Sequence, residues 1–413
     1  PPRMSLYQLE RDGDVQELIR VLRESDKERV QTRAAELLGN FGEHDDRRDV
    51  VNALVGAAQR DSDTVTAAAI DSLDELGGSA IEQLIGDMAG ANLEADAADW
   101  VKAKAFMQAL DADVAELRMA AANGLGRLDQ ADSVPKLAER FEDSDPRVRA
   151  RAARSAGKIG DTRATNPLES LLSDPKGAVR REAAEALGNI GNRQALQTLL
   201  PMYEDSNERV RRIAVGAFGN FENDRPVDYL VEALSDESAA VRRTAVYSLI
   251  ELLSNVPTER SHDIRDTVVD KLSNTDDQSV VVPLVEILEE STQPAQRRNT
   301  AWLLGRVAGQ QGRSRVIDAL VEALRDDDQM LRQFAATSLA ELGGEDNMVE
   351  RRLLKLVEDE HVEPAVKGQA IFTLGKVGGD RSRKVLDKLI DDTEHDIVRK
   401  KAFSAISKLG GRM

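Results

Sequence analysis

The sequence lacks cysteine altogether, so disulfide bonds, thiolate metal sites and cysteine nucleophiles are excluded. Aromatic residues make up only 3% of the 413 residues, although hydrophobic residues make up 41%. The core must therefore be built from Ala, Leu, Val and Ile, which suits closely packed helices. No apolar run is long enough to cross a bilayer, and no signal peptide is recognisable, so the sequence predicts a protein without membrane insertion.

Lysine is also scarce, because only 15 of the 56 basic residues are lysine, against 74 acidic residues and a net charge of -18. An acidic, lysine-poor and arginine-rich composition resembles that of proteins adapted to molar intracellular salt in halophilic archaea. Molar salt screens charges beyond about 3 Å, so long-range electrostatic steering is weak. Non-specific nucleic-acid binding depends on cationic surface, so it is not expected of this chain as a whole. We expect a cytoplasmic location.

A motif recurs along the chain: an apolar residue, here called the anchor, then Arg, two variable positions, two small residues, and a terminal Leu-Gly-x-x-Gly. Clear copies begin at Val148 (VRARAARSAGKIG) and Val179 (VRREAAEALGNIG). Five consecutive anchors, from Leu117 to Val241, are spaced by 31 residues. The anchors are Val30, Val65, Leu117, Val148, Val179, Val210, Val241, Gln296, Leu331, Val366 and Val398. Such a regular period indicates a repeat architecture.

Each repeat reads as an antiparallel pair of helices. A stretch with apolar residues at helical spacing, such as Leu168, Leu171 and Leu172, precedes each anchored stretch. Short polar turns separate the two, and the glycine 12 residues after the anchor is expected to end the second helix in the left-handed conformation. One pair cannot bury its apolar stripe alone, but stacked pairs can. The predicted fold class is therefore all-α, an α-solenoid (superhelix) of about eleven helix pairs.

We predict one continuous array over residues 4–413, with residues 1–3 interpreted as a cloning remnant or misassigned start before Met4. Two gaps between anchors are longer than one repeat, and each has room for an extra helix. We place these insertions at about 89–110 and 254–273, with helices near 97–110 and 263–272.

Two polar residues recur in register with the anchor. Arginine follows the anchor in most repeats, as Arg149 and Arg211 do, and aspartate stands five residues before it, as Asp174 and Asp236 do. Because the same residues return in every stack, we predict a ladder of ion pairs and turn hydrogen bonds between repeats. A row of ligand-binding arginines is the alternative interpretation.

These residues resemble the HEAT-repeat superfamily, and the V-R-x-x-A-A-x-A-L-G-x-x-G pattern is similar to the HEAT-like subclass first named for phycobilisome bilin lyases. The resemblance covers essentially the whole chain. It implies the solenoid fold, but that subclass contains lyases, scaffolds and other proteins, so it does not by itself imply an activity. Similar HEAT-like proteins of halophilic archaea occur with taxis genes, and this resemblance implies an adaptor role between signalling proteins and the motility motor.

The sequence shows no catalytic constellation, so we predict that the protein is not an enzyme and needs no cofactor. The four histidines are scattered without metal-ligand spacing, and no nucleophile elbow, P-loop or dinucleotide fingerprint occurs. His44, beside Asp45 and Asp46, reads as part of a solvated turn rather than a metal site.

Helical phase predicts a binding face instead. The residue six positions after the anchor points away from the apolar stripe of the second helix. At three of the eleven such positions the residue is aromatic (Tyr247, Trp302 and Phe372), and Phe334 stands at position 3 of the intervening repeat. Exposed aromatic residues with nearby cations are typical of protein interfaces. We therefore predict a groove between about residues 240 and 380 that binds a protein, formed by Tyr247, Trp302, Phe334, Phe372, Arg243, Arg298, Arg306 and Lys376.

Three alternatives remain open at this point. The rings could pack against neighbouring repeats and leave no binding face. The row Arg181, Arg212, Arg243 and Arg298, two positions after the anchors, could contact nucleic-acid phosphates, although the acidity of the chain argues against it. Bilin attachment is implied only by the family name, since no residue identifies it. No small-molecule substrate is indicated.

Overall fold

The computed structural model describes residues 5–91, 93, 97–221, 223–256, 258–273, 275–343 and 347–410. These residues form helices, and the described part of the chain contains one isolated β-bridge, between Thr275 and Ala308, but no strand. The predicted all-α class is confirmed. The helices group into two compact units, Pro1–Met202 and Tyr203–Met413. Residues 1–3, interpreted above as a cloning remnant, lie outside the described residues.

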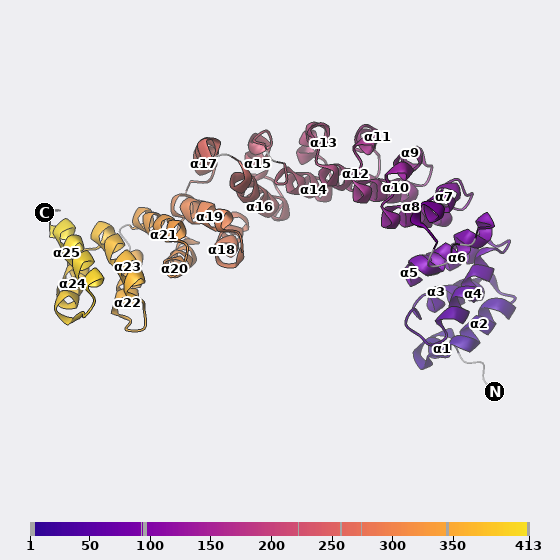
Figure 1. Ribbon diagram of the computed structural model, residues 1–413, viewed down its shortest axis with the longest axis horizontal. Coiled ribbons are helices and arrows are strands. Elements are labelled where there is room, and N and C mark those ends of the chain that lie inside the picture. The colour runs from indigo at the N-terminus through magenta and orange to yellow at the C-terminus, as the bar shows by residue number, and fades with distance from the viewer. Residues whose placement is uncertain are drawn as a thin grey trace. The chain divides into compact units, whose positions relative to one another are not determined.

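The helices of the first unit follow one another without long irregular segments among the described residues (Figure 1). They are α1(Leu6–Asp12), α2(Val15–Glu24), α3(Glu28–Leu38), α4(Arg47–Ala58), α5(Asp63–Leu76), α6(Gly78–Ala89), α7(Asp99–Ala109), α8(Ala115–Leu128), η1(Ala131–Ser133), α9(Val134–Glu139), η2(Arg140–Glu142), α10(Pro146–Ile159), η3(Thr162–Ala164), α11(Thr165–Leu171), α12(Gly177–Ile190) and α13(Arg193–Leu199).

The short helix η4(Leu200–Glu204) leads into the second unit. The helices of this unit are α14(Glu208–Phe218), α15(Val227–Ala233), α16(Ala239–Asn255), α17(Thr258–Leu272), α18(Gln278–Glu290), α19(Pro294–Val307), α20(Arg313–Ala323), α21(Gln329–Leu342), α22(Met348–Glu358), α23(Pro364–Val377), α24(Asp380–Asp392) and α25(Asp396–Gly410).

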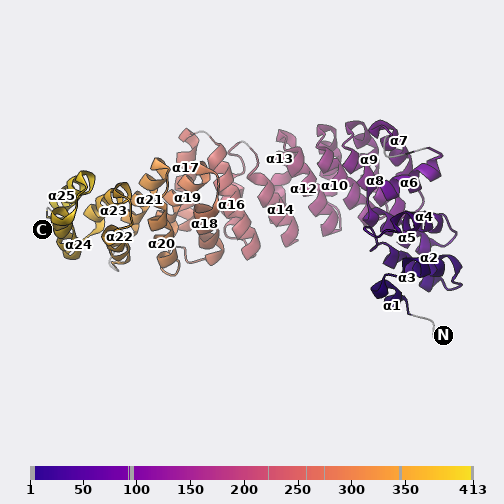
Figure 2. The ribbon, with the colours of Figure 1, turned by 60° about the horizontal axis from the view of Figure 1, so that its bottom comes forward.

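Within each unit the anchored helices pack side by side, and the preceding helix of each pair packs against its own anchored partner. In the first unit α8, α10 and α12 form such a row of second helices, and α7, α9 and α11 are their first helices (Figures 1 and 2). In the second unit α19, α21, α23 and α25 form the row, with α18, α20, α22 and α24 as first helices. The described helices thus form the predicted stack of helix pairs.

The first long gap between anchors contains two helices, α6 and α7, whereas a regular repeat has one helix between two anchored helices. The segment 97–110, where the sequence placed an extra helix, holds α7, which packs on α8 as a regular first helix. Its buried Phe106 lies 11 residues before the anchor Leu117, as Leu168 does before Val179. The helix without an anchored partner is α6, which packs on α4, α5 and α7.

The second long gap changes the arrangement of the layers. Helix α17 packs on α15, α16 and α19, whereas α18 packs on α16, α19 and α20. Arg265 of α17 contacts Trp302 of α19, but Glu286 of α18 contacts Tyr247 of α16. Figure 1 shows α15 and α17 on one side of the second helices and α18, α20 and α22 on the other. The first helices therefore change sides of the row between α16 and α19.

Neighbouring second helices approach closely through small residues. The glycine nine positions after one anchor faces a Ser or Ala seven positions after the next. A Cβ atom added to Gly157 would lie 2.5 Å from Ala186 Cα, and one added to Gly305 would lie 2.6 Å from Ser338 Cα. The Ser338 hydroxyl also donates a hydrogen bond of 2.7 Å to the Ala301 carbonyl oxygen of the preceding helix. Glycine at this position of the motif is therefore needed for the spacing of the helices.

The glycine three positions later was predicted to end the helix in the left-handed conformation. Gly160 and Gly191 do so, with φ of 69° and 65°. Gly343 and Gly378 do not, because their φ values are -61° and -73° and their chains leave the helix extended. The prediction is therefore confirmed for the first two glycines and wrong for the last two.

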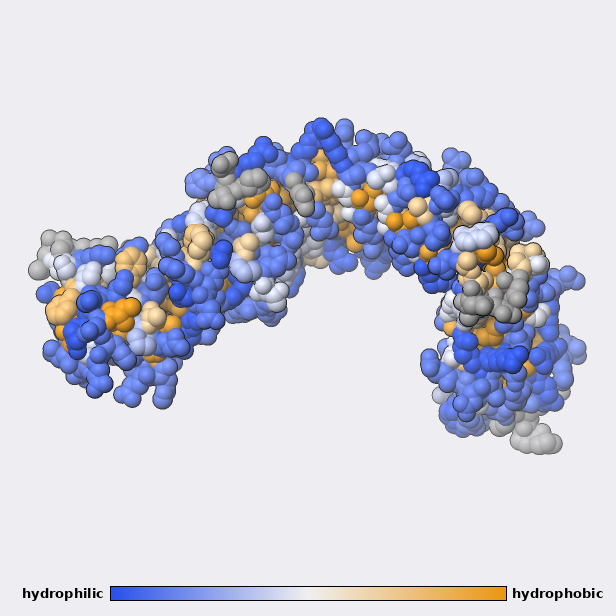
Figure 3. All heavy atoms as spheres, viewed as in Figure 1, coloured by the Kyte–Doolittle hydropathy of each residue, from blue (hydrophilic) through white to orange (hydrophobic). Residues whose placement is uncertain are grey.

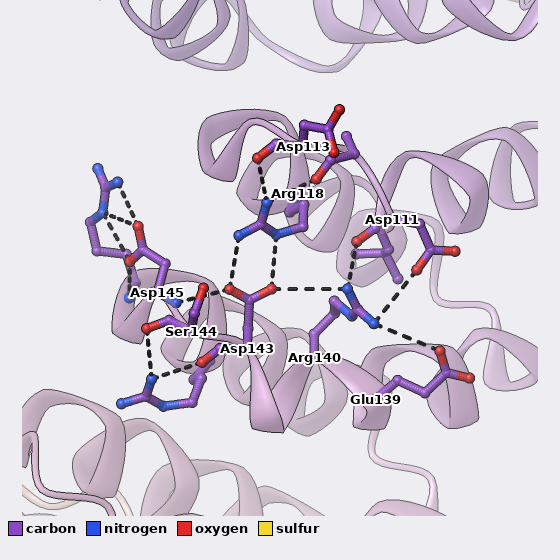
Figure 4. Close-up of polar contacts among 12 residues, drawn as sticks. Asp111, Asp113, Arg118, Glu139, Arg140, Asp143, Ser144 and Asp145 are labelled. Carbon is purple, nitrogen blue, oxygen red and sulfur yellow. Dashed lines mark hydrogen bonds and ion pairs between the residues drawn. The ribbon is translucent and has the colours of Figure 1, made fainter. Parts of the chain in front are cut away.

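The arginine–aspartate ladder is confirmed. Arg118 Nε and Nη2 donate to the two carboxylate oxygens of Asp143 in the next repeat at 2.8 and 2.9 Å (Figure 4). Arg149 makes the same two-bond contact with Asp174, at 2.7 and 3.1 Å, and also donates to the Asp143 carbonyl oxygen. Arg211 pairs in this way with Asp236. Each arginine thus joins the turn of its own repeat to the turn of the next.

The ladder makes stability sensitive to acid. Burial alone would raise the pKa of Asp174, but the hydrogen bonds from Arg149 and from the Lys176 amide outweigh burial and lower it. The same holds for Asp143 with Arg118. A carboxylate whose pKa is lowered by folding stabilises the fold above its unfolded pKa of about 3.9, and this stabilisation is lost as the pH falls through the folded pKa.

We therefore expect the denaturant midpoint to be constant at neutral pH and to fall steadily as the pH drops below about 4. Unfolding curves followed by circular dichroism at fixed molar KCl measure this. A midpoint that does not change down to about pH 2 would contradict the role given to these carboxylates.

Candidate functional site

Trp302 lies between two arginines on the face of α19 that points away from α18. The Arg306 guanidinium carbon is 4.0 Å from the centroid of the indole ring, and that of Arg265 is 5.6 Å away. Arg265 comes from α17 and also donates a hydrogen bond to the Asn299 side chain. The ring is half-buried, so one part of it remains open to solvent.

The two arginines are half-buried. Burial, together with the positive charge of Arg306, lowers the pKa of Arg265, and burial also lowers that of Arg306. Arg306 pairs with Glu341 of α21, whose own pKa is raised by burial. Arg265 Nε is buried and has no hydrogen-bond partner among the described residues. Both guanidinium groups stay protonated at neutral pH, so the surroundings of Trp302 are cationic.

Phe372 on α23 is surrounded by lysines in a similar way. Lys376 Nζ and Lys408 Nζ each lie 4.8 Å from the ring centroid, and Lys401 Nζ lies 5.5 Å away. Lys401 and Lys408 come from α25, and neither forms an ion pair with a residue that the structure describes. Three ammonium groups from two helices therefore converge on one half-buried ring.

Phe334 is half-buried on α21, which packs between α19 and α23. It lies three positions after its anchor, in the same sector of the helix as Trp302 and Phe372 in theirs. We call the surface formed by Trp302, Phe334 and Phe372 with Arg306, Lys376, Lys401 and Lys408 the ring face. Arg298, which was also predicted for the groove, is paired with Asp328 at 2.6 Å.

Tyr247 and Arg243 do not belong to the ring face. The Tyr247 hydroxyl donates a hydrogen bond of 2.8 Å to Glu286 of α18, and Arg243 pairs with the same carboxylate. Burial and the hydrogen bond to Glu286 raise the pKa of Tyr247. Because the first helices change sides between α16 and α19, the residues six positions after the anchor point in opposite directions on these two helices. The predicted groove is therefore not continuous between Tyr247 and Trp302.

Three cationic residues near the rings were missed by the sequence analysis. Lys401 and Lys408 stand at positions 3 and 10 after Val398, the positions that were read in other repeats, so the helical phase alone could have found them. Arg265 lies on the extra helix, and no signal in the sequence connects it to Trp302.

The row of arginines suggested for phosphate binding is partly neutralised. Arg181, Arg243 and Arg298 form ion pairs with Glu182, Glu286 and Asp328. The charges of Arg243 and Arg298 are therefore compensated within the protein, whereas Arg181 shares the Glu182 carboxylate with Arg154. Compensation at two of the four positions weakens the nucleic-acid alternative.

Comparison with known proteins decides the family. The family model for HEAT repeats matches residues 103–177, 165–251, 281–348 and 317–407, which together cover more than half of the chain. The chain belongs to the HEAT-repeat family. The first and second helices described above are thus the two helices of successive HEAT repeats.

A curated HEAT-repeat relative is similar over nearly the whole chain. The "HEAT repeat-containing taxis protein OE_2401F" of Halobacterium salinarum is 52% identical over 412 residues, which cover 99% of this chain and 99% of the relative. Its source is a halophilic archaeon, in agreement with the acidic and lysine-poor composition. Among solved structures, an engineered protein matches 96% of this chain and 99% of its own, with 20% identity and a TM-score of 0.42.

The surface of these HEAT repeats is mostly hydrophilic in the view of Figure 3, with hydrophobic residues in small separate areas. Among the helices that the structure describes, none combines the length and apolar character needed to cross a membrane. On the second helices of the second unit, arginine and lysine side chains gather around the half-buried rings of Trp302 and Phe372.

Proposed function

We propose that this HEAT-repeat protein is a cytoplasmic, non-enzymatic adaptor that binds a partner protein through the ring face, in the taxis signalling of a halophilic archaeon. The observation that carries the proposal is the pairing of partly open aromatic rings with cations on adjacent second helices. Rings and arginines dominate the binding energy of protein interfaces. The taxis role is supported by the printed name of the relative that is 52% identical.

The ring face suits a partner in molar salt. Salt weakens the attraction between separated charges, but it does not remove contacts made at van der Waals distance or the burial of rings. Arg306 stacked at 4.0 Å from the Trp302 centroid and the lysines around Phe372 also hold the rings in fixed positions. A fixed ring loses little conformational entropy when a partner covers it.

Replacing both Trp302 and Phe372 by alanine tests the proposal. We expect the double variant to recover at least about tenfold less of its partner than the wild type in a pull-down from native cells at native salt, because the two rings together are expected to contribute at least about 2 kcal/mol to binding. Helicity, measured by circular dichroism, should remain. Mass spectrometry identifies the proteins recovered, and cells that carry the variant should form smaller swarm rings.

Trp100→Ala is the matched control, because Trp100 is 67% exposed on α7 of the first unit and lies outside the ring face. It should recover the partner and swarm normally. Equal recovery by the control and by the Trp302 and Phe372 variant would refute binding through the ring face. Equal swarming of all three with lost recovery would refute the taxis role alone.

A further inference from the structure

A pocket of about 330 Å³ lies between α10 and α12 in the first unit, whereas the ring face belongs to the second unit. Its lining contains five basic residues, Arg147, Arg151, Arg154, Lys176 and Arg181, and one acidic residue, Glu182. Apolar parts of the wall come from Pro146, Ala150, Ala178 and Val179. Such an excess of positive charge is unexpected in a chain with a net charge of -18.

Glu182 organises two of the arginines. Its side chain is only 4% exposed and accepts hydrogen bonds from Arg154 Nε and Nη2 at 2.9 and 2.8 Å, and from Arg181 Nη2 at 2.6 Å. Burial would raise the pKa of Glu182, but these bonds outweigh burial and lower it. The carboxylate is therefore ionised at neutral pH and holds both guanidinium groups at the pocket.

Two other cations of the pocket, Arg151 and Lys176, are not compensated in this way. Arg151 donates to the neutral amide oxygen of Asn123 at 2.9 Å, and Lys176 is exposed and forms no ion pair with a described residue. Arg147, by contrast, is already paired with Asp145 and Glu116. Four cationic groups thus share the pocket with a single carboxylate.

This arrangement is not a general property of the stack. At position 6 after the anchor, where α10 has Arg154, the helices α3 and α5 of the same unit have Glu36 and Asp71. Burial and the nearby Glu116 raise the pKa of Asp71, as expected for an acidic surface. The inter-repeat ladder, in turn, uses Arg149 and Asp174 and does not involve the pocket.

We propose that this pocket binds a small phosphate ester of about the size of a nucleotide. Arg151, Arg154 and Arg181 would bind the phosphate, because guanidinium groups match two oxygens of a phosphate at once and a doubly charged group balances several cations better than one carboxylate does. Lys176 would add a point charge at the rim. The organic part of the ligand would lie on the apolar surface of Ala150 and Ala178.

Isothermal titration calorimetry of the full chain in molar KCl tests this, with AMP, ATP, pyrophosphate and inorganic phosphate as probes. We expect a nucleotide to bind more tightly than inorganic phosphate, because only the ester reaches the apolar wall. The double variant R151Q/R181Q should weaken nucleotide binding at least about tenfold, since it removes two charged donors. Lys176→Gln, at an exposed position, should weaken it less and does not endanger folding.

The variant R23Q/R193Q removes the same charge from two exposed arginines of the first unit and should bind like the wild type. If R151Q/R181Q and Lys176→Gln bind nucleotide as tightly as this control, or if the wild type binds none, the proposal is overturned. Binding of a hexaglutamate peptide without binding of any phosphate ester would also overturn it, in favour of an acidic protein segment. None of these results depends on the ring face.

Discussion

Replacing Gly157 by alanine is expected to destabilise the protein by about 2–3 kcal/mol, the usual cost of overpacking a tight core. In an open helix the same change is stabilising, since alanine has the higher helix propensity. Here the added Cβ would lie 2.5 Å from Ala186 Cα and 2.6 Å from Ala186 Cβ, and the backbone of α12 cannot move away without separating the two helices. Steric overlap should therefore reverse the sign of the propensity effect.

Gly56→Ala is the matched control for this prediction. Gly56 lies inside α4, is exposed, and a Cβ added there would meet nothing within 4 Å. It should gain about 0.5–1 kcal/mol of stability from the higher helix propensity of alanine. Denaturant unfolding at molar KCl measures both variants. A Gly157 variant as stable as the Gly56 variant would show that the second helices are not held at the close spacing described above.

Replacing Asp174 by asparagine should cost still more, about 2–4 kcal/mol, because it leaves the charge of Arg149 without its partner in a largely buried place. The side chains of Arg149 and Asp174 are only 14% and 6% exposed. Asparagine keeps an oxygen that can accept the hydrogen bond from the Lys176 amide, so the loss comes mainly from the ion pair between the repeats.

Asp132→Asn serves as the comparison, because Asp132 is 99% exposed and lies 3.9 Å from Arg163. An ion pair of this kind contributes little to stability, so no measurable change in the unfolding curve is expected. The double variant Arg149→Met with Asp174→Asn should recover part of the stability that Asp174→Asn loses, since it removes the unpaired charge. If Asp174→Asn unfolds at the same denaturant concentration as Asp132→Asn, the ladder does not stabilise the stack.

The repeat period and the motif were sufficient to predict the helix pairs and the ladder. A period of 31 residues and an apolar stripe on each helix leave one way to bury the stripes, which is to stack the pairs. Arg149 and Asp174 could be paired from the sequence because contacts between identical repeats must recur in register. Five of the seven residues of the ring face were predicted for the same reason, since Trp302 and Phe372, and likewise Arg306 and Lys376, occupy equivalent positions in their repeats.

The irregular parts depended on tertiary packing. Nothing in the local pattern of residues 254–273 indicates that the helices after α17 enter on the opposite side of the row, and this change separates Tyr247 from Trp302. The pocket between α10 and α12 was equally hidden, because Arg154, Arg181 and Glu182 stand at positions 6, 2 and 3 of their repeats and meet only through stacking. Periodicity determines contacts that repeat along the chain, whereas a contact that occurs once depends on where each helix finds the most burial.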